Sequence, residues 1–488
     1  MKKIIIPITI CLLLSLFSQS LKAQQEQQKY YPPTDSLVIR KLSQWQDLKF
    51  GLLMHWGPYS EWGIVESWSI CPEDLSWAAG GRKKGKSDNY NDYVKEYEAL
   101  QTTFNPVKFN PEKWAAAAKG AGMKYVIFTT KHHDGFCMFD SKYTDYKITD
   151  PKTPFSANPR SNIAKEIFAA FRKENLWTGA YFSKPDWHTE YYWWKKFPAV
   201  DRNCNYSIAK HPEEWKKFTE FTHHQIDELM TDYGKIDILW LDGGWVRKTS
   251  DEEVKNYLLE TYEGSRWARN PQNQDIDMDA IVAKARLKQP DLLVVDRAVE
   301  GPNQNYLTPE QQIPDKPLSY PWETCMTMAT SWSYVPNDTY KPTRQLIHTL
   351  CTIVSRGGNL LLNIGPGPEG DFDPVAYQRL EEIGKWMSVN SDAIYASKPV
   401  APYQSGNVVF TTVGKAVYAI YLAAENEKTL PAVIKINNWT PPQGSKAILM
   451  GSNKILSWKS AKGNTEITIP AALRNHPPSD YAWVFKFE

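Results

Sequence analysis

Asp242 is the residue of this sequence best placed to do chemistry. It ends the apolar run of ILWLDGGW (238–245), which is typical of a buried strand. Gly243 and Gly244 let the backbone turn away directly after the acid, so we expect the carboxylate to be exposed at the strand end. Aspartate at such a point is also a favoured helix N-cap. The segment alone therefore leaves a catalytic and a structural interpretation open.

A second acid is expected in the long proline-rich segment 296–325. This segment follows another apolar run and contains Arg297 together with Glu300, Glu310 and Glu323. A long loop at the end of a strand suits a catalytic acid, but the residues alone do not choose among the three glutamates. Two carboxylates about 5–5.5 Å apart would permit double displacement at a sugar carbon, with one as nucleophile and the other as acid and then base.

Three histidines lie at the ends of two further apolar runs, His55 in LLMHWG and His132 and His133 in TTKHHDG. Adjacent residues on a strand face opposite sides, and no H-x-x-x-H or H-E-x-x-H spacing is present. A metal shared by the adjacent histidines is therefore not expected, and all three are interpreted as neutral donors to hydroxyl groups. His223 and His224 fall within a helical pattern and are interpreted as solvent-facing or packing residues.

Other common catalytic arrangements are missing from the sequence. The stretch GGNLLLNIGPGPEG (357–370) lacks the spacing of a phosphate loop and is interpreted as a tight strand exit. No G-x-S-x-G motif occurs, so an esterase or peptidase lacks its nucleophile. No C-x-x-C pair occurs either, which argues against a thiolate zinc site. The carboxylates remain the candidates for the chemistry.

The first residues have the features of a secretory signal peptide. Two lysines precede an apolar run from Ile4 to Phe17, and Ala23 precedes a glutamine-rich segment. The run is too short to span a bilayer, and no later stretch is apolar enough for a membrane helix. We expect cleavage after about Ala23 and export, most simply to a periplasm.

Composition favours a carbohydrate substrate. Of 57 basic and 55 acidic residues, removal of residues 1–23 takes away three lysines and leaves 54 against 55, a balance that attracts neither nucleic acid nor an anionic membrane. The five remaining cysteines are an odd, widely spaced set and predict no disulfide framework. The chain has 20 Trp, 26 Tyr and 18 Phe, and the flat faces of Trp and Tyr suit stacking on sugar rings.

The elements that must position these residues alternate between strand and helix. Six apolar runs between about Asp47 and Ser397 indicate buried parallel strands, and the segments between them carry helix start and stop signals. Polar residues follow strand after strand, as at the rim of a barrel. We predict a (β/α)8-like TIM barrel in residues 24–397, with irregular helices after its fifth and sixth strands. Short alternating runs in 398–488 predict a C-terminal antiparallel β-sandwich.

The motifs FGLLMHWGPYS, KYVIFTTKHHDGF, GAYFSKPDW, ILWLDGGW and GGNLLLNIGP, in this order, resemble those of the glycoside hydrolase family 29 α-L-fucosidases. The likeness covers about residues 45–397. It implies a retaining hydrolase that removes terminal α-L-fucose from oligosaccharides or glycoconjugates without metal or cofactor. Within it, Asp242 matches the nucleophile, and the matching substrate-binding residues are His55, His132, His133, Tyr181, Trp240 and Arg297.

The resemblance also bears on two glutamates of the site. The family acid/base commonly lies about a dozen residues after the arginine, which favours Glu310, whereas Glu323 aligns with a neighbouring Trp-Glu pair and is the second choice. The pocket glutamate after HWG matches Glu66 better than Glu61, because Glu66 lies closer to the family spacing. In the implied mechanism Asp242 attacks the anomeric carbon, and Glu310 protonates the departing oxygen and then activates water.

Three alternative functions remain open from the sequence. The same barrel could hydrolyse another terminal sugar such as galactose, or transfer fucose to an acceptor other than water. From a different class, the chain could be a silent glycan-binding protein that keeps the aromatic groove.

Overall fold

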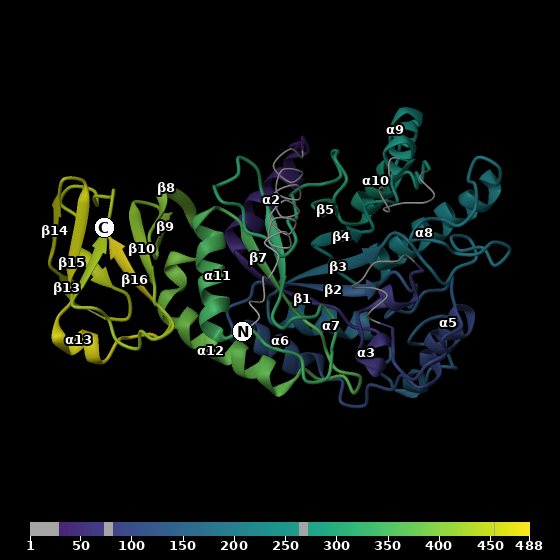
Figure 1. Cartoon of the computed structure of the whole chain (residues 1–488), viewed down its shortest axis with the longest axis horizontal. Helices are drawn as coiled ribbons and strands as arrows, with labels where there is room; N and C mark the ends of the chain where they lie inside the picture. Colours follow the sequence, from purple (N-terminus) through teal and green to yellow (C-terminus); the bar gives the residue numbers. More distant parts are fainter. Residues whose placement is uncertain (1–28, 73–81, 263–271, 453) are drawn as a thin grey trace, which may run out of the picture.

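The computed structural model describes residues 29–72, 82–262, 272–452 and 454–488, and the expected signal peptide (1–23) lies outside them. Figure 1 shows a larger part built around a parallel sheet and, at its left, a smaller part made of antiparallel strands. Within the described ranges, no helix has both the length and the apolar character needed to cross a membrane.

Seven parallel strands form a curled sheet in the order β5-β4-β3-β2-β1-β7-β6. They are almost wholly buried, as expected for a parallel sheet covered on both faces. Six of them were predicted, whereas β6 was not, because ETCMT contains no apolar run. The strands are β1 (Phe50–Met54), β2 (Tyr125–Lys131), β3 (Trp177–Ser183), β4 (Ile238–Asp242), β5 (Leu293–Asp296), β6 (Glu323–Thr327) and β7 (Asn359–Ile364).

The segment 303–311 links the two edge strands of this sheet. Isolated backbone bridges join Gln304 to Val295 of β5, and join Leu307 and Glu310 to Trp322 and Cys325. The proline-rich segment is therefore part of the barrel wall, and Glu310 lies beside β6. The predicted (β/α)8-like barrel is confirmed, with seven strands and this irregular segment in its described wall.

The predicted helices are present, and side-chain caps fix several of their starts. Asn110, Asn162 and Asp277 accept hydrogen bonds from backbone N–H groups of the first turns of α6, α7 and α10. No helix follows β5 in the described residues before β6, contrary to the expectation of an irregular helix there. The larger helices are α6 (Pro111–Gly120), α7 (Ile163–Lys173), α8 (Pro212–Asp232), α9 (Asp251–Tyr262), α10 (Met278–Lys288), α11 (Thr343–Ser355) and α12 (Pro374–Asn390).

Helix α2 (Ser36–Leu48) fills the amino end of the barrel. Its buried residues Val38, Leu42 and Trp45 belong to one apolar cluster with inward-facing strand residues. The Trp45 ring stacks on Tyr306, with ring centroids 3.9 Å apart. The barrel interior is thus a packed core, which leaves its carboxyl end for chemistry.

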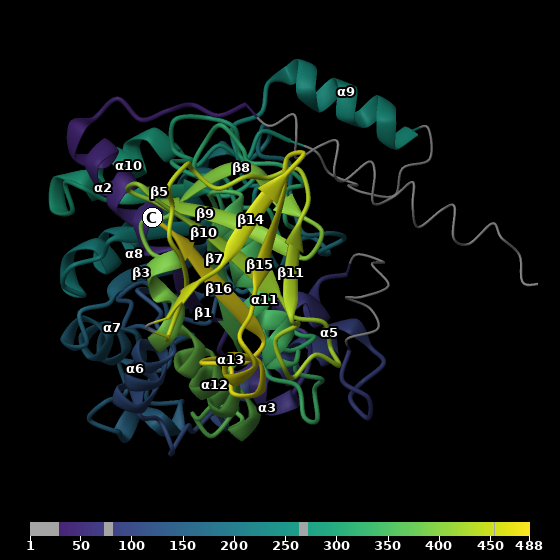
Figure 2. The ribbon, with the colours of Figure 1, turned by 90° about the vertical axis from the view of Figure 1, so that its left-hand side faces the viewer.

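The C-terminal part consists of two antiparallel sheets, so the predicted β-type fold of this part is confirmed. The six-stranded sheet, ordered β13-β12-β16-β10-β9-β8, contacts helix α11, and the three-stranded sheet β11-β15-β14 faces the viewer in Figure 2. The strands are β8 (Lys398–Ser405), β9 (Val408–Val413), β10 (Ala416–Leu422), β11 (Val433–Ile436), β12 (Ala447–Leu449), β13 (Ile455–Leu456), β14 (Trp458–Ala461), β15 (Asn464–Thr468) and β16 (Ala482–Phe487).

Short helices complete the described chain. They are α3 (Tyr59–Trp62), η1 (Ser67–Ile70), α5 (Tyr90–Glu98), η2 (Ala99–Thr102), η3 (Pro154–Ala157), η4 (Ser391–Ala393) and α13 (Ala471–Asn475).

Candidate active site

A cavity of about 380 Å³ opens at the carboxyl ends of the barrel strands. All nine residues selected as catalytic or substrate-binding from the sequence line it, although they come from the ends of five different strands, β1 to β5, or from the segments that follow them. These residues are His55, Glu66, His132, His133, Tyr181, Trp240, Asp242, Arg297 and Glu310. Glu61, Glu300 and Glu323 are not among the residues that line it.

Asp242 is the most heavily hydrogen-bonded acid of the cavity. Its carboxylate accepts hydrogen bonds from Tyr181 Oη (2.7 Å), Arg297 Nη1 (2.9 Å) and the backbone N–H of Gly243 (2.8 Å). Burial alone would raise the pKa of Asp242, but Arg297, with help from His133 and Tyr181, holds this pKa well below its ordinary value. Asp242 is therefore an anion over the whole working pH range.

The N-cap interpretation of Asp242 is wrong. The next helix, α9, begins only at Asp251, and the described partners of the Asp242 carboxylate do not include a helical N–H group. The apolar run of β4 places this acid at the cavity, and the glycines after it turn the chain away.

Both adjacent histidines line the cavity, contrary to the expectation that they face opposite sides. Strand β2 ends at Lys131, so His132 and His133 lie in the following turn, where strand alternation does not apply. Their ring centroids are 4.3 Å apart. Burial lowers the pKa of His133 to about 3 and that of His55 to about 4. The rings are therefore neutral, as their expected role toward hydroxyl groups requires.

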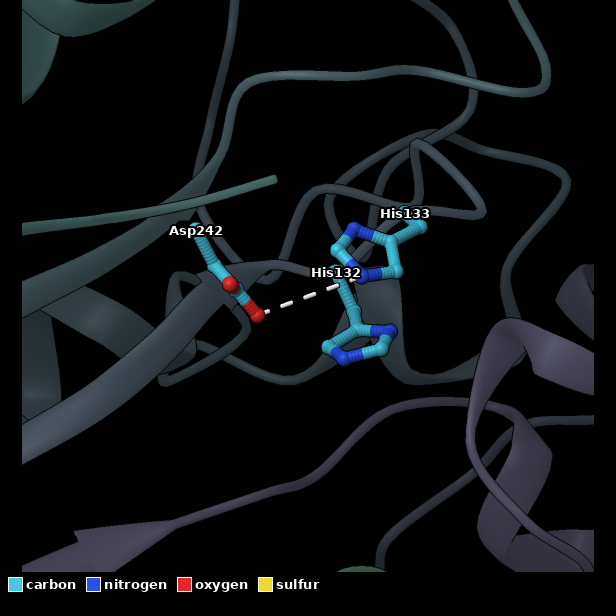
Figure 3. Close-up of side chains that lie close together, drawn as sticks. All are labelled: His132, His133 and Asp242. Atoms are coloured by element: carbon cyan, nitrogen blue, oxygen red, sulfur yellow. Dashed lines mark ion pairs between the residues drawn. The ribbon is translucent and has the colours of Figure 1, made fainter. Parts of the chain in front are cut away.

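His132, His133 and Asp242 form a set whose ligand atoms lie within 4.8 Å of one another (Figure 3), a spacing that could hold a metal ion. The sequence argument did not anticipate this set. The Arg297 guanidinium already pairs with the same aspartate at 2.9 Å. A second cation beside it would meet like-charge repulsion in a buried site, so the geometry favours the arginine as the counter-ion.

Glu66, and not Glu61, reaches the cavity. The Glu66 side chain is 3% exposed, and its Oε1 accepts a hydrogen bond from the backbone N–H of Ser333 at 2.9 Å. Burial raises the pKa of Glu66 to about 7. Glu61 instead accepts a hydrogen bond from the Thr103 hydroxyl (2.6 Å) outside the cavity lining.

Arg297 joins the two acids of the site. Its Nη1 binds Asp242 and its Nη2 binds Glu310, so one guanidinium holds both carboxylates at the cavity. Glu310 is the more accessible acid, with 41% of its side chain exposed against 15% for Asp242. This difference suits a proton-exchanging group beside a fixed anion.

Glu323 lies inside the barrel, below the cavity. It is fully buried in β6 and accepts a hydrogen bond from Tyr125 Oη at 2.5 Å. Burial raises the pKa of Glu323 to about 8, although Tyr125 and Tyr306 lower it in part. Glu323 is therefore mostly neutral at pH 7 and belongs to the core, not to the cavity.

Several cavity residues escaped the sequence argument. The Arg202 guanidinium lies over the rings of Trp68 (4.9 Å) and Trp245 (5.1 Å), and Trp332 lies beside His55. Their positions, two residues after Glu66 and three after Asp242, were the available signal for the first two tryptophans. For Arg202 no sequence signal existed, because it comes from a long loop after β3.

Comparison with known proteins decides the family. A sequence model for α-L-fucosidase matches residues 17–392. The chain belongs to the α-L-fucosidase family. It is accordingly a glycoside hydrolase of that family, and the resemblance inferred from the motifs is confirmed.

Individual relatives match over nearly their whole length. Human tissue α-L-fucosidase is 30% identical to this chain over an alignment that covers 97% of this chain and 96% of the human protein. The structure of α-L-fucosidase isoenzyme 1 from Paenibacillus thiaminolyticus superposes with a TM-score of 0.71 at 27% identity, covering 93% of this chain and 99% of the other. The Thermotoga maritima α-fucosidase in complex with fucose gives a TM-score of 0.69 at 26% identity, covering 94% and 100%.

Proposed function

We propose that this protein is an exported, retaining α-L-fucosidase that releases terminal α-L-fucose from oligosaccharides or glycoconjugates. The observation that supports this proposal best is the pair of acids on one guanidinium, Asp242 on Nη1 and Glu310 on Nη2 of Arg297. Retaining glycosidases keep their two carboxyl groups about 5–5.5 Å apart, whereas inverting enzymes need about 6.5–9.5 Å to admit a water molecule. Two acids that share one arginine are close neighbours.

In the first step Asp242 attacks the anomeric carbon and the bond to the leaving oxygen breaks. Its depressed pKa keeps the carboxylate ionised, and three hydrogen-bond donors hold it still, which favours a near-attack geometry. Glu310 gives its proton to the departing oxygen. It therefore has to leave Arg297 and take up a proton first, which its partial exposure to solvent permits.

In the second step the roles of the acids change. Ionised Glu310 removes a proton from water, the water oxygen bonds to the anomeric carbon, and the ester to Asp242 breaks. Fucose leaves with its original anomeric configuration, and Glu310 has regained the proton that it gave away.

The remaining cavity residues would hold the sugar. Neutral imidazoles of His55, His132 and His133 offer hydrogen bonds without a net charge, which suits hydroxyl groups. Leu53, Val65, Cys325 and Trp332 add apolar surface to the lining, where a methyl group is tolerated and a hydroxymethyl group is disfavoured.

The decisive experiment uses an aryl α-L-fucoside with wild type, Asp242→Gly and Glu310→Ala, each with and without azide. Azide rescue of Glu310→Ala should yield α-fucosyl azide, and rescue of Asp242→Gly should yield β-fucosyl azide. Proton NMR of the wild-type reaction should show α-L-fucose as the first product. First formation of the β-anomer would instead establish inversion, and a wild type inactive on aryl and branched fucosides alike would favour a glycan-binding protein.

The export part of the proposal rests on the leader alone. Its lysines, apolar run and Ala23 predict cleavage after about residue 23. N-terminal sequencing of protein from the periplasmic fraction should begin near Gln24. A mature protein that begins at Met1 would contradict export by this route.

A further inference from the structure

The turn after β3 contacts the main chain at Asp242 and Gly243, at the end of β4. The backbone N–H of Lys184 donates to the carbonyl oxygen of Asp242 (2.9 Å), and Pro185 packs so closely on Gly243 that a Cβ there would lie 2.2 Å from the proline ring. On the other side of β4, the backbone N–H of Arg297 donates to Leu241 (3.1 Å). The end of β4 is thus held between the ends of β3 and β5.

A buried ion pair spans the same strand ends. Lys184 Nζ binds Asp296 Oδ1, and the two side chains are 0% and 4% exposed. Lys184 directly follows β3, and Asp296 is the last residue of β5 and precedes Arg297. Neither residue is among those that line the cavity, so neither meets the substrate.

We propose that Lys184 and Asp296 are positioning residues, which set Arg297 relative to Asp242 by tying β3 and β5 together across the end of β4. This inference rests on the proposed function, because the position of Arg297 affects activity in this way only if Asp242 is the nucleophile. The register supports it, since Ser183 of β3 lies opposite Asp242, and Leu241 of β4 opposite Asp296. A displacement of either neighbouring strand end would therefore move one partner of the Asp242–Arg297 pair.

A stabilising role alone would not require this pair. Replacing a buried ion pair by neutral groups is often tolerated, because desolvation of the two charges offsets much of their attraction. The chain offers a matched control in Lys41 and Asp237, whose Nζ and Oδ1 lie 2.5 Å apart with side chains 8% and 7% exposed. Lys41 belongs to α2, at the closed amino end of the barrel, and Asp237 directly precedes β4.

The test compares the double variants Lys184→Met/Asp296→Asn and Lys41→Met/Asp237→Asn with wild type and Asp242→Gly. Each is assayed for kcat, KM and the pH profile of kcat/KM on an aryl α-L-fucoside, and for thermal unfolding. We expect kcat/KM of the first variant to fall about 10- to 100-fold, because small misplacements of reacting groups are that costly. Its acid limb should also move to higher pH. The groups that face Asp242 are His55, His132, His133, Tyr181 and Arg297, and Arg297 is the one whose positive charge chiefly lowers the pKa of Asp242.

The control variant should keep the wild-type kcat/KM and acid limb, whatever its loss of thermal stability. Wild-type kinetics in Lys184→Met/Asp296→Asn, or equal losses in both double variants with unchanged pH profiles, would overturn the inference. Activity in Asp242→Gly would instead overturn the proposed function. Should the first variant fail to fold, Asp296→Asn is measured in its place, because it keeps the size of the side chain and removes the ion pair. Wild-type kinetics and a wild-type pH profile in this variant would overturn the inference equally.

Discussion

Arg297→Met removes the one guanidinium that binds both acids of the site. Arg297 Nη1 and Asp242 Oδ1 are 2.9 Å apart, and the two side chains are 19% and 15% exposed, so water screens this pair little. An opposite charge at such a distance lowers a carboxyl pKa by about 1–3, which corresponds to about 1.4–4 kcal/mol. The pKa of Asp242 should rise by that amount in the variant.

The sign of the effect on stability follows from the direction of the shift. Because the pKa of Asp242 is depressed in the folded protein, its ionisation stabilises the fold above the unfolded pKa of about 3.9, and this contribution is lost as pH falls through the folded pKa. Arg297→Met loses most of this stabilisation by ionised Asp242. Its unfolding free energy should therefore lie about 1.4–4 kcal/mol below wild type at pH 7. This gap should change little between pH 7 and 3, because it closes only as pH falls through the depressed folded pKa values of Asp242.

Two assays test this reasoning. Urea unfolding between pH 3 and 7 gives the difference in stability, and kcat/KM on an aryl α-L-fucoside gives the acid limb of the free enzyme, which reports the ionisation of Asp242. The limb should appear at higher pH in Arg297→Met. Arg297→Lys should show a smaller displacement, because its ammonium keeps the positive charge but lacks the guanidinium fork that binds both acids. Equal stability of Arg297→Met and wild type at pH 7, together with a wild-type acid limb, would refute the assignment of Arg297 as the counter-ion.

Four further outcomes are expected. Glu323→Gln should keep kcat within about tenfold of wild type and Glu310→Gln should lose about 10²–10⁴-fold on a fucoside with a poor leaving group; the reverse order in steady-state kinetics would exchange their roles. Because the pKa of Glu323 is raised to about 8, wild-type stability should fall as pH rises from about 4.3 to 8, and Glu323→Gln, followed by thermal melts, should lose this part of the pH dependence. Trp45→Ala should cost about 3–5 kcal/mol of stability in urea unfolding, with KM unchanged. Dialysis against a chelator should leave kcat unchanged. A loss of activity that a divalent metal restores would contradict the assignment of Arg297 as the counter-ion of Asp242.

Local sequence determined much of this architecture. Apolar runs of four residues, 125–128 and 238–241, begin the buried strands β2 and β4, because a strand covered on both faces is mostly apolar. Caps such as Asn162 fixed helix starts for the same local reason. The strand β6 shows the limit, because its polar residues Glu323 and Thr324 are buried only by the wall around them.

The active-site acids show which positions the sequence predicts and which ones only the tertiary structure determines. The sequence by itself placed Asp242 at a strand end, since the run before it and the glycines after it act within a few residues. Before a family resemblance was considered, the residues alone did not choose between Glu310 and Glu323. The strand pattern also predicted that His132 and His133 face opposite sides. Only the tertiary structure puts Glu310 on Arg297 at the cavity and Glu323 in the core, because these positions depend on how segment 303–311 closes the barrel wall. The positions of these side chains depend on strand register and on packing between distant parts of the chain, which local residue patterns do not encode.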